Sequence, residues 1–209
     1  KHVKLYRYKG EKMNEEEMKI KLKKYDIKIF DEIDSTHIYA KNNIDNLNNN
    51  TLVIARSQTG GIGTHGRVWY TGKDNIAMTL VYKPKCKISE IENITIKIAN
   101  SIKSAIFSLY KIDLKVKEPN DLMLDNKKIC GILTEINTLK ENINYLLISI
   151  GFNVNEEKFD NELELIATSL KKELKKEFDI TDICIKIIQN IHEQIIVNLT
   201  SQNNRKDVY

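Results

Sequence analysis

The sequence predicts an α+β fold, in which a mixed sheet carries helices mainly on one face. Segments rich in β-branched residues follow one another in runs joined by short turns, which favours hairpins over regularly alternating strand–helix units. Two segments, 89–110 and 182–199, carry apolar residues at intervals of three and four. This spacing is typical of helices that bury one side against a sheet.

The bulk composition indicates an ordinary soluble protein. The chain has 209 residues, 41% of them hydrophobic and 30% charged, which suits one large domain or a domain with a short appendage. The net charge is only +4, and the lysines are scattered among acids, which argues against a nucleic-acid surface. No apolar run is long enough to span a membrane, and no signal peptide is recognisable. The three cysteines form no metal-binding pair, which fits a cytoplasmic protein.

The N-terminal part of the chain predicts a helix, a strand and a second helix. Residues 1–27 are rich in lysine and glutamate, and Met18 and Leu22 lie on a thin apolar stripe, so we expect an N-terminal helical segment. Residues 27–33 alternate enough to form a strand. Ser35 then suits the N-cap of a following helix, because its hydroxyl can accept a backbone N–H of the first turn.

The middle of the chain predicts two strands and a long helix. Residues 51–56 are mostly β-branched, and residues 75–83 form a nearly continuous apolar run, which indicates a central strand. The helix is expected over 89–110, with Ser89 as its cap.

The C-terminal half predicts more strands and then helices. We expect Gly151 to end the sheet in a turn, a Lys/Glu-rich helix after residue 170, and a last helix over 182–199. The expected strands and their hairpin turn span 113–118, 122–124, 125–127 (the turn), 128–136 and 143–150.

A glycine-rich loop, Gln58 to Trp69, is the strongest local feature. Glycine lets backbone N–H groups point into one concavity and lets a ligand approach closely. Arg67 adds a permanent cation, and Trp69 adds a flat apolar face. These groups together suit a nucleotide or a small carboxylate, and a glycine-rich surface turn is the plain alternative.

Known phosphate-binding motifs do not fit this loop. Gly61, Gly63 and Gly66 have the spacing of the dinucleotide fingerprint, but the residues after Gly66 predict no helix, and no acidic residue follows at the required distance. The string also fits a kinase glycine-rich loop, yet the other kinase motifs are absent. A P-loop is excluded because no Gly-Lys-Ser/Thr occurs.

Five segments, taken in order, resemble the motifs of the biotin–protein ligases. One motif alone would be weak, but five with the right order and spacing are specific. The resemblance covers residues 28–199, which we take as one catalytic domain, and leaves a polar tail over 200–209. The five segments are Asp34-Ser35-Thr36, Gln58 to Trp69, Lys117-Glu118-Pro119-Asn120-Asp121, Lys128 to Glu135, and Ile150-Gly151-Phe152-Asn153.

The resemblance implies both a fold and a reaction. The family has a mixed, largely antiparallel sheet flanked by helices, related to class II aminoacyl-tRNA synthetases. Its members convert biotin and ATP with Mg²⁺ into biotinyl-AMP and pyrophosphate. A lysine of a biotin carboxyl carrier domain then attacks this adenylate and releases AMP. The implied cofactor is ATP with Mg²⁺, the substrate is biotin, and the partner is the carrier domain of a biotin-dependent carboxylase.

The resemblance assigns the charged chemistry to the loop and to one lysine. A carboxylate that attacks a phosphate brings two anions together, so cations and N–H donors must offset the repulsion. Arg67 and Lys128 are the expected catalytic cations for the biotin carboxylate and the phosphate. The backbone of Gly60, Gly61 and Gly63 is expected to add neutral donors around biotin.

Biotin recognition is assigned to polar side chains near the first motif. Ser35, Thr36 and Gln58 are expected to bond the ureido ring, because its buried polar groups need partners. Gly131, in the segment that follows Lys128, is expected to border biotin. Trp69 should pack over the ligand or over adenine.

The nucleotide and metal roles rest on two amides and one acid. Asn120 and Asn153 offer amide edges that pair with adenine, alongside Arg67, Trp69 and Lys128. Asp121 is a candidate for Mg²⁺ or for accepting the proton of the carrier lysine. In the plain alternative, Asn120 and Asp121 are ordinary turn residues after a proline.

The chain departs from the family pattern at a few positions. Ile62 and Thr64 stand where the family often has arginines, and Glu118 replaces the usual tryptophan. These departures bear on the charge balance of the loop and leave the reaction class unchanged.

Two other functions remain open. A lipoate-protein ligase or octanoyltransferase shares the fold, but its acyl group has no ureido ring, so Ser35, Thr36 and Gln58 favour biotin. The other is a biotin-sensing repressor fragment. The segment before Ile27 is too short for a complete winged helix-turn-helix domain, so no DNA-binding domain and no DNA partner are expected for this chain. A homodimer is left open.

Overall fold

The computed structural model describes residues 13–160 and 162–197. These residues form a seven-stranded sheet in the order β1-β2-β3-β7-β6-β5-β4. All neighbouring strands are antiparallel except β1 and β2, so the predicted mixed, largely antiparallel sheet is confirmed. The strands are β1 (Asp26–Phe30), β2 (Thr51–Ala55), β3 (Ile76–Tyr82), β4 (Lys115–Lys117), β5 (Asp121–Leu124), β6 (Lys127–Leu139) and β7 (Asn142–Phe152).

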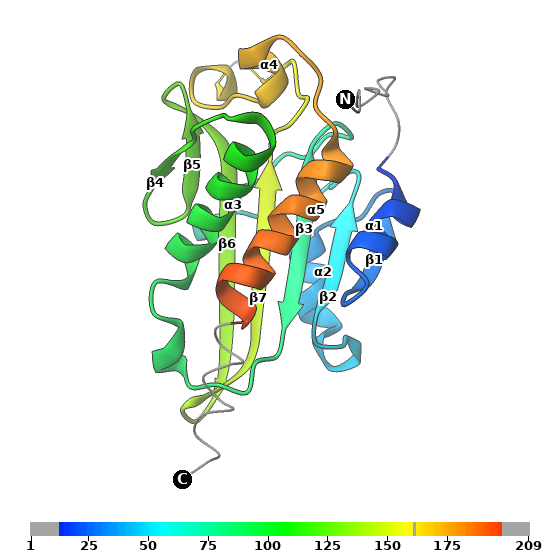
Figure 1. Ribbon diagram of the computed structural model, residues 1–209, viewed down its shortest axis with the longest axis vertical. Coiled ribbons are helices and arrows are strands. Elements are labelled where there is room, and N and C mark those ends of the chain that lie inside the picture. The colour runs from blue at the N-terminus through cyan, green and yellow to red at the C-terminus, as the bar shows by residue number, and fades with distance from the viewer. Residues whose placement is uncertain (1–12, 161, 198–209) are drawn as a thin grey trace, which may run out of the picture.

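Helices cover the two faces of this sheet unequally. The helices α3 (Ile94–Tyr110) and α5 (Ile180–Ile191) pack side by side over one face, and α1 (Glu15–Lys21) lies beside α5 (Figure 1). The short helix α2 (Thr36–Asn42) lies on the opposite face, against β2, β3 and β7. Helix α4 (Leu170–Leu174) sits at one end of the sheet. The prediction of helices mainly on one face is therefore confirmed.

Burial follows these two faces. All seven residues of β3 are buried, and β3 pairs with β2 on one side and β7 on the other, which confirms the central strand. The larger apolar cluster lies under α3 and α5, and a smaller cluster lies under α2. Among the described residues, no helix is both long and apolar enough to cross a membrane.

The predicted hairpin turn between β5 and β6 is confirmed. Asp125 and Asn126 have φ values of 47° and 64°, and Leu124 pairs with Lys127 across the turn. Asp and Asn tolerate this left-handed conformation, which a two-residue hairpin turn requires. The turn fixes the register of the first residues of β6, in which Lys128 pairs with Met123 of β5.

The predicted start of the long helix is wrong. Residues Ile88–Ile91 form a separate 3₁₀ turn, and Ser89 lies inside this turn and does not cap α3. Asn93 then takes φ of 56°, so the chain changes direction just before α3 begins at Ile94. Asn visits this conformation more readily than most residues, because its short polar side chain can bond locally.

Two further boundaries differ from the sequence prediction. Gly151 does not form a turn, because it lies within β7 and pairs with Ala77 and Gly131. The last helix begins at Ile180, and its regular part gives way to a π-helix over His192–Ile196. The predicted continuation to residue 199 and the polar tail lie outside the described residues.

The N-terminal helix offers a direct test of the packing. Met18 is fully buried, whereas Ile20 on the same helix is 74% exposed. We expect Met18→Ala to lower the free energy of unfolding by about 2–5 kcal/mol, because it removes buried apolar volume. Ile20→Ala is the matched control and should change it by less than about 0.5 kcal/mol. Urea unfolding measures both, and equally small effects would place α1 outside the cooperative core.

Candidate functional site

A cavity opens on the α2 face of the sheet, beside the glycine-rich loop. Its walls come from the start of α2, from the loop over 58–69, and from β3, β6 and β7. The polar and charged groups that line it are Ser35, Thr36, His37, Gln58, Thr64, Asn120, Lys128 and Ser149. Most of these are predicted site residues, so the fold brings distant motifs together around one space.

Ser35, Thr36 and Gln58 meet at one end of this cavity. Ser35 is the N-cap of α2, as predicted, and its Oγ accepts the N–H of Ile38 at 3.4 Å. Gln58 Oε1 accepts both the Thr36 N–H at 2.8 Å and the Thr36 hydroxyl at 3.1 Å, while Gln58 Nε2 donates to Thr71. These bonds fix the orientation of the amide and leave Ser35 and Thr36 nearly fully buried.

Two of the predicted backbone donors of the loop are engaged elsewhere. The Gly60 N–H donates to the Asp34 carbonyl at 2.8 Å, and the Gly63 N–H donates to the Arg67 carbonyl at 2.7 Å. The Gly60 bond thus ties the loop to Asp34. The Gly63 bond closes the loop on itself, together with the bond from Trp69 N–H to Gly61 O at 2.8 Å. Gly60 and Gly63 therefore act on the shape of the loop in this conformation.

Trp69 lies on a floor of glycines. Gly131 and Gly151 pair directly across β6 and β7, and an added Cβ would lie 3.0 Å from the Trp69 ring at Gly131 and 2.3 Å at Gly151. Only residues without a side chain therefore allow the indole to lie this close to the sheet. The indole Nε1 is buried and has no hydrogen-bond partner among the described residues.

Gly151 is a site residue that sequence reasoning missed. It was interpreted as a turn glycine, yet it lines the cavity within β7. The signal was present, because Gly131 and Gly151 each interrupt an otherwise apolar strand, and a strand glycine often marks a close approach.

Lys128 and Asp121 form an ion pair next to Trp69. Lys128 Nζ lies 2.6 Å from Asp121 Oδ1 and 5.3 Å from the centre of the Trp69 ring. The β5–β6 hairpin brings the two together, since Asp121 pairs with Gly131 in the sheet. The structure therefore brings three predicted residues from three motifs together at one charged end of the cavity, which Trp69 and Lys128 line.

Arg67 does not join this cluster. Its side chain is exposed, does not line the cavity, and makes no ion pair with the residues that the structure describes. Ile62 and Thr64, the two departures from the family pattern, do line the cavity. The role of Arg67 as a cation at the ligand stays a prediction.

The two predicted adenine-binding amides have different surroundings. Asn120 lines the cavity, and its Nδ2 donates to the Ile132 carbonyl at 3.1 Å. Asn153 is buried outside the cavity lining, and its Nδ2 donates to the Thr168 carbonyl at 3.1 Å. Asn153 thus ties the end of β7 to the segment before α4. The contacts of Asn120 and Asn153 with adenine stay predictions.

A metal shell built from protein side chains alone is not evident. Among the described residues, no group of three or more His, Cys, Asp or Glu side chains could hold an ion. Mg²⁺ often takes only one or two carboxylates and completes its shell with water and substrate phosphates. Asp121, one carboxylate at the charged end, fits such a partial site.

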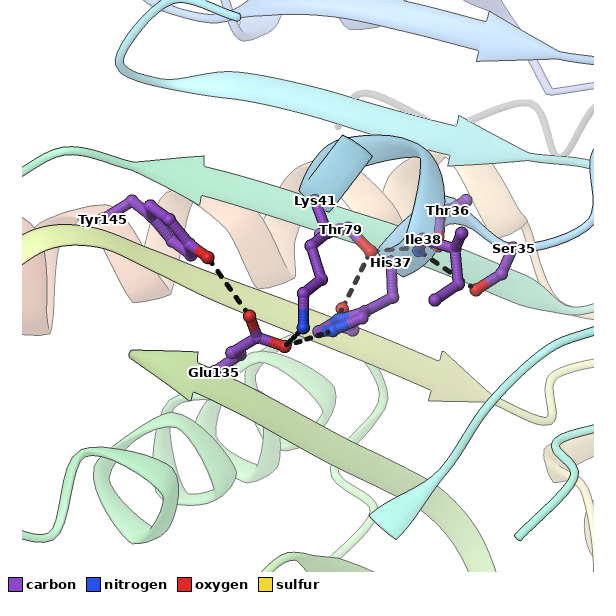
Figure 2. Close-up of polar contacts among 9 residues, drawn as sticks. Ser35, Thr36, His37, Ile38, Lys41, Thr79, Glu135 and Tyr145 are labelled. Carbon is purple, nitrogen blue, oxygen red and sulfur yellow. Dashed lines mark hydrogen bonds and ion pairs between the residues drawn. The ribbon is translucent and has the colours of Figure 1, made fainter. Parts of the chain in front are cut away.

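The polar end of the cavity continues into a buried network that the sequence did not reveal. His37 contacts Glu135 (Figure 2). His37 also contacts Ser149, and Thr79 links Ser149 to Thr36. His37 directly follows the Asp-Ser-Thr motif, and no sequence pattern marks it as a site residue. Only the pairing of β3, β7 and β6 beneath α2 shows what it touches.

Comparisons with known proteins show the family to which this chain is similar. The model of the family described as "Biotin/lipoate A/B protein ligase family" matches residues 29–155. The bifunctional ligase/repressor BirA of Bacillus spizizenii is 34% identical over 148 residues, which are 69% of this chain and 45% of that protein. The biotin–[acetyl-CoA-carboxylase] ligase of Paracoccus denitrificans is 29% identical over 123 residues, which are 58% of this chain and 51% of that protein. The chain thus spans about half the length of the curated relatives that it matches.

Solved structures share the fold. A biotin protein ligase from Aquifex aeolicus, in complex with biotin and ATP, superposes with a TM-score of 0.71 at 26% identity, over 81% of this chain and 69% of that one. A lipoate protein ligase from Thermoplasma acidophilum superposes with a TM-score of 0.59 at 10% identity, over 82% and 84%, which shows the fold alone. The sheet is therefore that of the biotin protein ligases, a fold related to class II aminoacyl-tRNA synthetases.

The glycine floor under Trp69 can be tested by fluorescence, because the chain has a single tryptophan. Gly151→Ala places a methyl group where the indole lies, so we expect a red-shifted emission and stronger quenching by acrylamide. Gly63→Ala is the control within the loop, since its Cβ would meet only the Arg67 carbonyl oxygen at 3.5 Å. Unchanged emission in a folded Gly151→Ala protein would contradict the close contact.

Proposed function

Because this chain belongs to the biotin/lipoate A/B protein ligase family, we propose that it activates biotin with Mg-ATP as biotinyl-AMP and transfers biotin to a lysine of a carboxyl carrier domain. The observation that carries this proposal is the division of one cavity into a polar end and a charged end. Thr36 and Gln58 lie at the polar end, and Lys128 lies at the charged end.

The polar end suits a cyclic urea. A urea ring carries two N–H donors and one carbonyl acceptor, and burying it without partners would cost free energy for each unmatched group. Ser35, Thr36 and Gln58 offer hydroxyl and amide groups in fixed orientations within a largely buried wall. A plain aliphatic acyl chain would leave these polar groups without a ligand partner.

The charged end suits the joining of a carboxylate to a phosphate. Lys128 is already held there by Asp121, so no reorganisation is needed to present its charge to two approaching anions. Arg67 would add a second cation if the loop carried it inward over bound ligands. The closed face of the sheet and Trp69 would limit the access of water to the adenylate.

Asp121 has two proposed duties. It holds the ammonium group of Lys128, and it would contribute a carboxylate to Mg²⁺ or accept a proton from the carrier lysine. An ordinary lysine has a pKa near 10.4, so a nearby base assists its attack. Mg²⁺ would supply charge neutralisation at the phosphates, and Asn120 is the amide placed best for the nucleotide.

Three further assignments belong to this proposal. We expect a cytoplasmic protein, since the three cysteines are free and buried. We expect no sequence-specific DNA binding by this chain, although some relatives are named ligase/repressors. A homodimer is compatible with the proposal and is not required by it.

Pyrophosphate exchange into ATP separates biotin from the other acyl groups that the family handles. We expect exchange with biotin and none with lipoate or octanoate, because only biotin carries a urea for the polar end of the cavity. Exchange driven by lipoate or octanoate in place of biotin would instead support the rival ligase, which shares the fold.

Lys128 can be tested against its neighbour in the sequence. Lys128→Ala should lower biotin-dependent exchange by at least about 100-fold, the usual cost of losing one preorganised charge-stabilising group. Lys127→Ala is the matched control, and exchange should stay near normal. Lys127 Nζ donates to the Glu164 carbonyl, and Lys127 does not line the cavity. Near-normal exchange in a folded Lys128→Ala protein would show that Lys128 is an ordinary structural lysine.

A further inference from the structure

A partly buried carboxylate anchors one end of the network beneath α2. Glu135 accepts hydrogen bonds from Lys41 Nζ at 3.0 Å, His37 Nε2 at 3.1 Å and the Tyr145 hydroxyl at 3.2 Å (Figure 2). Burial acts to raise the pKa of Glu135, but the bonds from Lys41 and His37 outweigh it and lower that pKa. Glu135 is therefore ionised and can only accept.

From His37 the network continues through three hydroxyls to Gln58. His37 Nδ1 lies 2.8 Å from Ser149 Oγ, which lies 2.8 Å from Thr79 Oγ1. Thr79 Oγ1 lies 3.0 Å from Thr36 Oγ1, which donates to Gln58 Oε1 at 3.1 Å. Gln58 Oε1 also accepts the Thr36 backbone N–H, so this far end of the row is an acceptor as well.

Both ends accept, and this limits the hydrogens available between them. Five contacts join Glu135 to Gln58, and each needs one hydrogen. The three hydroxyls supply one each, and neutral His37 supplies one more, so one contact lacks a hydrogen. Protonated His37 would supply two and would complete the row.

His37 is neutral near pH 7. It is nearly fully buried, and this burial is the main cause that lowers its pKa. The neighbouring Glu135 raises the pKa and Lys41 lowers it, and the balance lies below the usual value of about 6.5. The carboxylate holds the hydrogen on Nε2, so Nδ1 accepts from Ser149.

We propose that neutral His37 is a positioning residue. It leaves the row of contacts from Glu135 to Gln58 one hydrogen short, and so makes the polar end of the cavity an acceptor for a ligand N–H group. Thr79 has a single hydrogen for its two neighbours, Ser149 and Thr36. It donates this hydrogen to Thr36 Oγ1, so the Ser149 oxygen keeps an open acceptor site, and Ser149 lines the cavity. A ligand N–H fills this site.

The same arrangement discriminates between acyl groups. The ureido ring of biotin brings N–H donors, whereas an octanoyl or lipoyl tail brings none to this end and leaves the acceptor unfilled. The inference thus deepens the proposed function, on which it rests for the identity of the ligand. It assigns part of the preference for biotin to His37 and Glu135.

The affinity for biotin should depend on pH with a defined sign. Below the pKa of His37, the imidazolium supplies the missing hydrogen and puts a positive charge behind the acceptor, so a ligand N–H is disfavoured. We expect the dissociation constant of biotin to rise by about 2- to 12-fold as the pH falls from 8 to 5, the worth of one hydrogen bond. Equilibrium dialysis with labelled biotin measures it.

Glu135→Gln separates this role from a purely structural one. The glutamine amide can donate to His37 Nε2, which moves the imidazole hydrogen to Nδ1 and completes the row without any charge. Biotin binding should then be weak at every pH and lose its pH dependence. Glu141→Gln makes the same chemical change at an exposed carboxylate that pairs with Lys87, and it should keep the normal profile.

The tautomer of His37 gives a readout that needs no ligand. In the native protein at pH 8, ¹⁵N NMR should show Nε2 protonated and Nδ1 bare, and Glu135→Gln should reverse this. Protonated Nδ1 in the native protein at pH 8, or a Glu135→Gln binding profile like that of the native protein, would overturn the inference. Absence of biotin binding at any pH, with the expected tautomer present, would instead count against the proposed function.

Discussion

The cavity exists because small residues face one another in register across the sheet. Ala77 on β3, Gly151 on β7 and Gly131 on β6 pair side by side and lie on the α2 face. Asp121 continues this row on β5. A shift of one residue in any of these strands would turn its members to the other face and close the floor with a side chain. Trp69 can lie against the sheet only because this row is nearly bare.

Along β3 and β7, the side chains on the α2 face change from small to polar and then to apolar. Ser149 lies on β7 two residues before Gly151, and it pairs with Thr79 on β3. Two positions further lie Leu147 and Val81, which pack beneath α2. The face thus passes from a bare floor through a hydroxyl band to a closed apolar core. The hydroxyl groups of Thr79 and Ser149 lie in this narrow middle band, where each must find a partner.

Polar groups buried beside an apolar core explain the density of the network under α2. An unmatched buried group costs more than a hydrogen bond gains, so such networks fix their members in one arrangement. The bond from Thr36 to Gln58 joins α2 to the glycine-rich loop, and the bond from His37 to Ser149 joins α2 to β7. The short helix is therefore positioned by polar contacts as much as by apolar packing.

Much of the fold and part of the site follow from sequence pattern. Apolar runs and a two-residue turn located β3, β5 and β6, and the motif residues Thr36, Gln58 and Lys128 do line one cavity. The pattern was less informative where glycine has several uses. Gly60 and Gly63 were expected to offer donors to a ligand, yet the Gly60 N–H bonds the Asp34 carbonyl and the Gly63 N–H bonds the Arg67 carbonyl within the loop. A glycine in a sequence shows that a side chain is absent, and it does not show what occupies the space.

The sequence by itself determined the alternation of strands, the amphipathic helices and the residue types that a ligase of this family needs. These properties are local, because they depend on spacings of two to four residues and on short motifs. Only the tertiary structure decided which residues meet. Strand register places Gly151 beneath Trp69 and His37 above Ser149. The register of β3 against β7 depends on pairings between residues more than 50 positions apart, which no local pattern encodes.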